Sequence, residues 1–316
     1  MHTRSRVSPA TSRAALLAMG PAVNPVIGLL DAMRDHGIEP ADHAEVSVDG
    51  AIHRYQIDGD KPGSRNGWLV LRDRFGVAGS WKSGASCTWS ATNTTRMSRA
   101  EKDALYSSIR QAKAEAQRQR EVEHQAAADR ASMLWAKATP AKAEHPYLVR
   151  KRIPPGNARQ SGDLLVLRIE DVSGNTRSLQ FIGPDGTKRM LSGGAKRGHF
   201  IFVASSSPAD LIVIAEGFAT ASTVATQFPG ACVLAAIDCG NLIHVAQAVR
   251  SRYPDAQLVI AADDDRLSPG NPGLTAAREA AAAVKAKIVR PVWPDGSPDS
   301  LSDFNDLANY LMEAPA

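Results

Sequence analysis

The sequence predicts an α/β protein whose C-terminal part builds a parallel sheet flanked by helices. From residue 209 onward, short runs of Val, Ile and Leu alternate with segments of helical composition, which is the pattern of parallel strands joined by crossover helices. Before residue 209, β-rich segments lie on either side of a long polar stretch without Gly or Pro. We therefore expect a small α+β module, a helical connector and a β-rich subdomain ahead of the parallel sheet.

The N-terminal part predicts a short disordered segment followed by the small α+β module. Residues 1–23 are rich in Ser, Pro, Arg and Ala and show no sustained hydrophobic period, so we expect disorder there. Residues 24–92 form the predicted module, in which a helix precedes several strands separated by Gly- and Asp-rich turns. The helix is expected at 26–34 and the strands at 44–48, 52–57, 68–71 and 77–81.

Residues 93–139 are predicted to form the helical connector. No Gly or Pro occurs from Met97 to Thr139, and Ala, Gln, Arg and Glu dominate the composition. Ser98 and Glu101 have the spacing of a capping box, which predicts the start of the helix. Apolar residues are sparse, so most of this helix is expected to be exposed.

Residues 140–208 predict a compact β-rich subdomain with strands at 164–169, 176–182 and 188–191. The final region, 209–316, then alternates strands with helices. The strands are expected at 211–215, 231–237, 257–262 and 287–291, and the helices at 218–227, 241–252, 272–285 and 304–312.

Carboxylates follow two of these predicted strands directly. Glu216 ends the run Leu211–Ala215 and precedes Gly217, and three aspartates from Asp263 to Asp265 end the run that begins at Leu258. Ligands of open α/β sheets collect beyond the carboxyl ends of the strands. If the two strands are neighbours, Glu216, Asp263 and Asp265 converge, and a hard cation such as Mg²⁺ or Mn²⁺ would relieve their repulsion. Alternation points Asp264 the other way, so it either supports the ligands or is a plain surface residue, and the second is favoured.

At these residues the chain resembles the Toprim domain of bacterial primases, topoisomerases and some nucleases. The family's glutamate matches Glu216, and its Asp-x-Asp matches Asp263 and Asp265. The resemblance is most specific to Toprim primases of plasmids, integrative elements and phages, which have a catalytic core of the DnaG type. The stretches that carry it are His145–Leu148, Gly240–Leu242 and Asp303–Ala308, and it covers 140–310.

The resemblance implies a Toprim-type sheet and two-metal-ion nucleotidyl transfer. Glu216, Asp263 and Asp265 would hold one or two divalent ions, with Glu216 alternatively ordering the attacking hydroxyl. Asp303 fits equally well as the N-cap of the last helix or as a further residue facing the metal. Asp306 belongs to the same stretch and gives a weaker signal. Relatives of this kind usually work with a replicative helicase, so single-stranded DNA, nucleoside triphosphates and a helicase are the implied partners.

Cations precede the acidic residues along the chain. Residues 151–208 carry a net charge of +5, whereas 209–316 carry −6. This order is typical of a protein that grips a phosphate backbone beside a metal site, although uneven charge can also be solvated surface. A glycine-rich loop flanked by cations can approach phosphates closely. By resemblance, template or nucleotide binding is assigned to Lys188, Arg189, Lys196 and Arg197, with Lys151, Arg152 and Arg168 as second choices.

The small module mixes tryptophans with cations, as single-stranded nucleic-acid binders do. Core packing is favoured for Trp68 and Trp89, whereas Trp81 is an even choice between core and template binding. The module as a whole is therefore a candidate template-binding region.

Several function classes are disfavoured. The three cysteines form no C-x-x-C pair, so we expect no zinc site of the ribbon type. No P-loop motif occurs, which argues against a helicase or ATPase, and no tyrosine stands in a topoisomerase-like context. No run is long and apolar enough for a membrane span and no signal peptide is convincing, so a cytoplasmic protein without membrane contact is expected.

The function predicted from the sequence is DNA primase, making short primers on single-stranded DNA for a mobile element. Two alternatives stay open: a Toprim nuclease using the same carboxylates, and a non-catalytic single-stranded-DNA-binding replication factor. The β-rich subdomain favours the primase over the nuclease. The full carboxylate set argues against an idle domain, because repelling charges without a ligand destabilise the fold.

Overall fold

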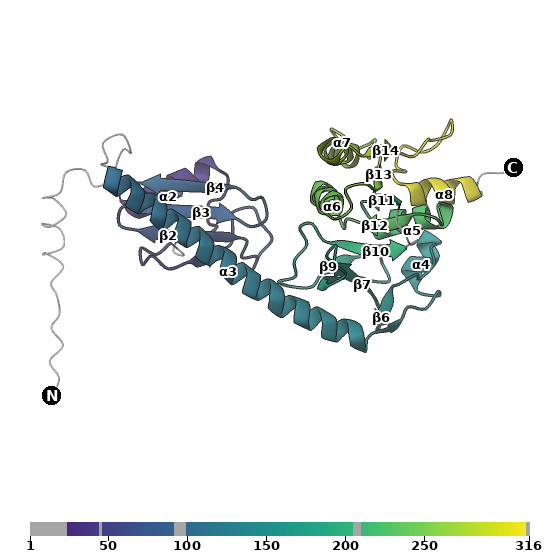
Figure 1. Ribbon diagram of the computed structural model, residues 1–316, viewed down its shortest axis with the longest axis horizontal. Coiled ribbons are helices and arrows are strands. Elements are labelled where there is room, and N and C mark those ends of the chain that lie inside the picture. Colours follow the sequence, from purple (N-terminus) through teal and green to yellow (C-terminus); the bar gives the residue numbers. More distant parts are fainter. Residues whose placement is uncertain (1–23, 44–45, 92–98, 205–209, 314–316) are drawn as a thin grey trace, which may run out of the picture. The chain divides into compact units, whose positions relative to one another are not determined.

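The computed structural model describes residues 24–43, 46–91, 99–204 and 210–313. The chain divides into two compact units between Arg120 and Glu121. The division falls inside the long helix α3 (Arg99–Lys137) (Figure 1). Within the described part of the chain, no helix is both long and apolar enough to cross a membrane. The predicted start of the connector at Ser98 lies outside the described residues.

The first unit is a four-stranded antiparallel sheet with one helix packed on it. Helix α2 (Pro25–Asp35) begins with proline, and the Asn24 side chain accepts a hydrogen bond from the Val26 amide, which fixes the helix start. Its apolar side contacts the sheet through Leu29 and Met33, both fully buried. The strands, in sheet order, are β1 (His53–Tyr55), β2 (Gly67–Arg72), β3 (Phe75–Ser80) and β4 (Ser86–Ser90).

The strand predicted at 44–48 is wrong. Residues 46–48 form no strand, while 44–45 lie outside the described residues. The chain turns here instead, because the Asp49 side chain accepts a hydrogen bond from the Ala51 amide and Gly50 adopts a φ of +71°. Strand β4 was not predicted from the sequence, because its Ser and Thr residues interrupt the apolar pattern.

The second unit is built on one mixed ten-stranded sheet. Eight strands follow the order β14-β13-β11-β12-β10-β7-β6-β5, and β8 and β9 continue from the other edge of β7. Their bounds are β5 (Thr139–Pro140), β6 (Arg159–Ser161), β7 (Leu164–Glu170), β8 (Thr176–Ile182), β9 (Lys188–Met190), β10 (Phe200–Ala204), β11 (Leu211–Ala215), β12 (Cys232–Ala235), β13 (Gln257–Ala261) and β14 (Lys287–Val289).

Strand β10, which was not predicted from the sequence, joins the two halves of this sheet. Strands β11 to β14 run parallel, as expected, whereas β10 pairs antiparallel with both β12 and β7. The region 140–208 therefore shares its sheet with the parallel region that follows. A continuous sheet holds the cations of the first region at a fixed position relative to the carboxylates of the second.

Helices cover both faces of this sheet (Figure 1). Helix α6 (Cys239–Arg252) and α7 (Pro272–Val284) pack on one face. Helix α4 (Pro146–Lys151) and α5 (Phe218–Gln227) pack on the other, where α8 (Phe304–Glu313) lies against α5. In the parallel part, Ala215 of β11 is in register with Ala261 of β13 and Ala235 of β12. The residues that follow these three alanines therefore emerge at one edge of the sheet.

Candidate metal-binding and nucleic-acid site

Glu216 leaves the carboxyl end of β11 and is half-buried beside the start of α6. Burial raises the pKa of its carboxyl, and the backbone amide of Cys239, the first residue of α6, acts in the opposite direction. Gly217 follows as the N-cap of α5, and Lys188 Nζ would lie 3.9 Å from a Cβ at this position. The structure thus places an ammonium group from β9 next to the turn that carries Glu216.

Asp263 and Asp265 follow the neighbouring strand β13. The Asp265 side chain accepts a hydrogen bond of 2.9 Å from the amide of Gly273 in the first turn of α7. A Cβ at Gly273 would come within 2.8 Å of Asp265 Oδ2 and 3.1 Å of Asp263 Cβ, so glycine permits this close approach. The buried Oδ1 of Asp263 has no hydrogen-bond partner among the described residues.

The favoured prediction that Asp264 is a surface residue is wrong, because this residue is only 2% exposed. Its carboxylate accepts hydrogen bonds of 2.8 Å from Asn271 Nδ2 and 3.1 Å from Trp293 Nε1, and Arg290 lies at 3.6 Å. The Asp264 amide also donates to the Ser302 carbonyl at 2.6 Å. This carboxylate therefore fastens the loop between β14 and α8 to the sheet edge that carries Asp263 and Asp265.

Asp303 caps α8 and also lies near the acidic cluster. Its Oδ1 accepts a 2.7 Å hydrogen bond from the Asp306 amide, which is the N-cap role considered from the sequence. It is also one of the charges that raise the pKa of Asp263. Asp306 itself turns to Lys151, with Oδ1 3.2 Å from Nζ.

Crowding and burial hold these carboxylates in an electrostatically unfavourable state. Burial, together with Asp265 and Asp238, raises the pKa of Glu216 to about 7. Burial, together with Glu216, Asp303 and Asp265, raises the pKa of Asp263 to about 8. Lys188 acts in the opposite direction on both groups. The neighbouring carboxylates therefore disfavour ionisation of Glu216 and Asp263, and a bound cation would reverse that effect.

The donor set fits a hard divalent cation. It consists of carboxylate oxygens only, as Mg²⁺ and Mn²⁺ prefer, and it includes one buried oxygen without a donor. Within the described residues, no three His, Cys, Asp or Glu side chains are already close enough to hold one ion jointly. The carboxylates thus lie at the same edge of the sheet without forming a closed set of ligands.

Lys188 and Arg189, two of the cations predicted to bind nucleic acid, are neighbours on β9. Lys188 and Arg189 are both exposed, but neighbours on a strand point to opposite faces. Lys188 lies on the side of the acidic site, since its Nζ would be 3.9 Å from a Cβ at Gly217, and it acts to lower the pKa of Glu216 and Asp263. Arg189 therefore projects from the other side of β9.

Lys196 and Arg197 lie in a loop anchored to the start of α6. Lys196 forms a 2.5 Å ion pair with Asp238, which is the N-cap of α6, and Arg197 is exposed. The Asn241 side chain holds the loop by donating to the carbonyls of Lys196 and His199, at 3.1 and 2.9 Å, and by accepting from the Gly198 amide at 2.9 Å. The loop is thereby fixed at the edge where Glu216 lies.

The second-choice cations make ion pairs away from β9. Arg152 pairs with Glu313 at 2.5 Å, and Lys151 pairs with Asp306 as described. Arg168 pairs with Glu170 and lies over the Trp135 ring at 5.5 Å. None of these three is brought to Glu216, although Lys151 acts on the pKa of Asp303.

The tryptophans of the first unit are only partly available. Trp68 is 7% exposed and Trp89 packs against the core, as favoured from the sequence. Trp81 is half-buried, with the Arg54 guanidinium 4.3 Å from its ring centre and that of Arg120 at 5.3 Å. An arginine already stacks on the ring that was proposed for a base.

Three residues of the site were not assigned a role from the sequence. Asp238 adds a further carboxylate near Glu216, and its only sequence signal was a position after an apolar run. Ile237, which precedes it, has a φ of +82°, an unusual value for a β-branched residue. Asn241 belongs to the Gly-Asn-Leu stretch that carries the resemblance, but nothing in that stretch indicates its burial. It is only 1% exposed, and its side chain makes four hydrogen bonds to backbone groups.

Comparison with known families identifies the region that carries these carboxylates. Residues 211–312 match the model of the Toprim domain. The match begins at β11 and includes Glu216, Asp263, Asp265 and Asp303, so these four carboxylates lie entirely within the matched region.

Two curated relatives extend the similarity beyond the Toprim domain. Both are proteins of Escherichia coli named DNA primase TraC, with 33% identity over 290 residues and 32% identity over 324 residues. The alignments cover 87% and 94% of this chain but 27% and 22% of the relatives. The chain thus spans about a quarter of the length of these proteins.

Solved structures of bacteriophage T7 proteins also resemble the chain. The primase fragment of the T7 primase-helicase protein aligns with a TM-score of 0.41 and 17% identity, over 52% of this chain and 70% of that one. The second structure contains T7 lagging-strand DNA polymerase with primase domains of two gp4 subunits bound to an RNA/DNA hybrid and dTTP. It gives a TM-score of 0.38 and 18% identity, over 49% of this chain and 76% of the matched chain.

Proposed function

We propose that this chain is the catalytic core of a DNA primase, which joins nucleotides into short primers on a single-stranded DNA template. The observation that carries the proposal is the set of carboxylates at the carboxyl ends of β11 and β13, faced by Lys188 from β9. The similarity to relatives named DNA primase supports the same activity. A replicative helicase and a mobile-element origin belong to the proposal as partner and context.

Glu216, Asp263 and Asp265 would hold the divalent ions, Mg²⁺ or Mn²⁺, with Asp303 as a further candidate. When bound, such ions neutralise the charge of the attacked phosphate and of the leaving pyrophosphate. The carboxylates must lose their protons first, because the pKa values of about 7 and 8 for Glu216 and Asp263 leave part of the site protonated at neutral pH. Protons and metal therefore compete for these oxygens.

The cations have separate proposed roles. Lys188 is suited to hold a phosphate of the nucleotide, since it is exposed and faces the carboxylates. Lys196 is held against Asp238, so it is positioned to meet the same phosphates or the template backbone. Arg197 and Arg189 would contact the template, and the module 24–92 with Trp81 is a separate candidate for template binding.

Primer synthesis on mixed single-stranded templates, with labelled nucleotides and Mg²⁺ or Mn²⁺, tests the proposal. We expect short products from the wild type and none from Asp263→Asn/Asp265→Asn, whereas Asp255→Asn, an exposed carboxylate of the same unit, should keep full activity. Shortened templates without products would instead establish a nuclease. Template binding without products and without metal-dependent stabilisation would establish a non-catalytic DNA-binding factor.

A further inference from the structure

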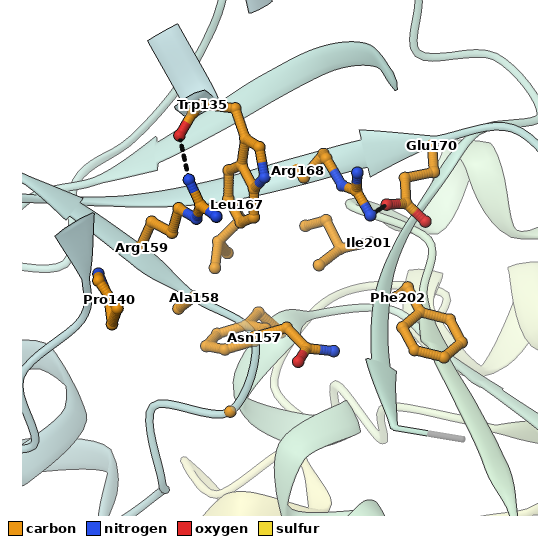
Figure 2. Close-up of a pocket in the computed structure, with 12 residues that line it drawn as sticks. Trp135, Pro140, Asn157, Ala158, Arg159, Leu167, Arg168, Glu170, Ile201 and Phe202 are labelled. Carbon is orange, nitrogen blue, oxygen red and sulfur yellow. Dashed lines mark hydrogen bonds and ion pairs between the residues drawn. The ribbon is translucent and has the colours of Figure 1, made fainter. Parts of the chain in front are cut away.

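A pocket of about 530 Å³ opens in the second unit where the sheet splits (Figure 2). One edge of β7 is shared by two strands: β6 pairs with residues 164–166 and β10 with residues 169–170. Leu167 and Arg168 lie between these two pairings and line the pocket. Because N–H and C=O groups alternate between the edges of an antiparallel strand, one of the two residues presents its backbone groups to the opening.

The walls of the pocket combine flat apolar surface with a few polar groups. Leu167 and Ile201, both almost fully buried, form apolar wall, and Phe202 adds an aromatic ring. Figure 2 shows Arg159 and Arg168 on either side of Trp135, with Asn157 and Phe202 across the opening. The volume and the small number of convergent polar groups are those of small-ligand sites.

Glu170 is the unusual member of this set. It is only 6% exposed, and its charged partner is Arg168 (Figure 2). Apart from that ion pair, no hydrogen-bond donor of acceptable geometry reaches Glu170 Oε1 among the described residues. Burial raises the pKa of this carboxyl. A buried carboxylate with unused acceptor capacity is costly unless a ligand supplies donors.

The pair of a carboxylate and a guanidinium selects among flat heteroaromatic ligands. Guanine carries two adjacent donors, N1–H and N2–H₂, next to the acceptor O6 on one edge. A carboxylate can accept from both donors while an arginine donates to the acceptor. Uracil and thymine would place two acceptors on that edge, and adenine and cytosine offer one amino donor beside an acceptor. The chemistry of Glu170 and Arg168 therefore favours guanine.

We propose that this pocket binds a single unstacked guanine base, held by Glu170 and Arg168 against Phe202 and the apolar wall. The inference rests on the proposed function, which supplies nucleotides and single-stranded DNA. The base could come from the template strand or from a free guanine nucleotide. Phe218, which also lines the pocket, is the first residue of α5, the helix that follows Glu216.

Binding measured in EDTA separates this site from catalysis. Short labelled oligothymidylates with one central guanine, hypoxanthine, adenine or cytosine are titrated by fluorescence anisotropy, and GMP and AMP are titrated through tryptophan fluorescence. We expect guanine to bind about tenfold more tightly than adenine or cytosine, as one bidentate contact allows. Hypoxanthine, which lacks the N2 amino group, should lose several-fold in affinity.

Variants assign the preference to the pocket. Glu170→Gln should reduce the guanine preference to about twofold or less, and Asn157→Trp at the exposed mouth should weaken binding of every base. Glu279→Gln, an exposed carboxylate on α7, is the matched control and should bind as the wild type does. Melting temperatures within the error of the wild type would establish that each variant is folded.

Two comparisons make the outcomes distinct. Asp263→Asn/Asp265→Asn should keep the guanine preference, so a loss of primer synthesis alone leaves this inference intact. A preference for guanine that is seen only with oligonucleotides identifies the template as the source of the bound base. A preference for GMP over AMP identifies a free nucleotide as the source. Equal binding of all bases, no binding of any, or an unchanged preference in Glu170→Gln would overturn the inference.

Discussion

Replacing Asp263 by asparagine should change how the stability of the protein depends on pH and metal. The pKa of Asp263 is raised from 3.8 to about 8, and that of Glu216 from 4.5 to about 7. Between the ordinary and the raised pKa, the folded protein keeps a proton that the unfolded chain releases. The free energy of unfolding therefore falls as pH rises from about 4 to about 8, and no such loss occurs below that window.

The size of this loss follows from the shift. Each pKa unit is worth about 1.4 kcal/mol, so Asp263 alone could cost up to ~5 kcal/mol at pH 8 without metal. Glu216 is one of the charges that raise the pKa of Asp263, so the two groups titrate as a pair and their costs do not add. Asp263→Asn removes one of the repelling charges. We expect the variant to be more stable than the wild type at pH 8 in EDTA, by ~2 kcal/mol or more, and similar to it at pH 4.

A bound metal ion should reverse this order of stability between the wild type and Asp263→Asn. A cation that binds only the folded state adds ~2.7 kcal/mol at one hundred times its dissociation constant. For a unit of this size that corresponds to roughly 5–10 °C in melting temperature. The wild type should show this increase with Mg²⁺ or Mn²⁺, and Asp263→Asn should lose most of it.

Thermal unfolding from pH 4 to 9, in EDTA and in saturating Mg²⁺, measures both effects. Asp255→Asn is the control, because Asp255 is exposed on the surface of the same unit and should leave both curves unchanged. An Asp263→Asn variant with the wild-type pH slope and the wild-type response to metal would refute the electrostatic account of the site.

Three further predictions follow from the neighbours of the carboxylates. Asp264→Ala should lower the free energy of unfolding, measured by chemical denaturation, by ~3 kcal/mol, because it leaves Asn271 and Trp293 without a buried acceptor. Asp264→Asn should be destabilised less. Equal stability of Asp264→Ala and the wild type would contradict this role of Asp264. Lys188→Ala should move the pH profile of primer synthesis to higher pH, because Lys188 acts to lower the pKa of Glu216 and Asp263. The control Arg189→Ala should leave the profile in place. Identical shifts in the two variants would contradict this role of Lys188. Asn241→Ala should release the loop that carries Lys196 and reduce kcat/KM about tenfold in the same assay. The matched surface change Gln247→Ala should have a smaller effect. An unchanged kcat/KM in Asn241→Ala would mean that the loop needs no anchor.

The parallel part of the fold could be predicted because its strands are continuous apolar runs. The strand at 211–215 and the helix at 218–227 were predicted with the bounds that the structure has. The same runs located Glu216, Asp263 and Asp265, since a residue after a buried strand must lie at the sheet edge. Their roles as ligands stay predictions.

What the sequence could not supply depends on contacts between distant residues. Strand β10 is a short run after a loop, and only its pairing with both β7 and β12 makes it the link within the sheet. Asp264 looked like a surface residue because its partners Trp293 and Arg290 come from a loop more than twenty residues away. Lys196 and Arg168 were grouped with free cations, but each is paired with a carboxylate that no local pattern connects to it.

Pyrophosphate release tests the central proposal most directly, because nucleotidyl transfer liberates pyrophosphate and phosphodiester hydrolysis does not. The wild type is mixed with a single-stranded template, nucleoside triphosphates and Mg²⁺ or Mn²⁺, with the template or the metal omitted in turn. We expect release that requires all components and is lost in Glu216→Gln and in Asp263→Asn/Asp265→Asn but kept in Asp255→Asn. Release equal in wild type and carboxylate variants, or none from the wild type under any template and metal, would contradict the account.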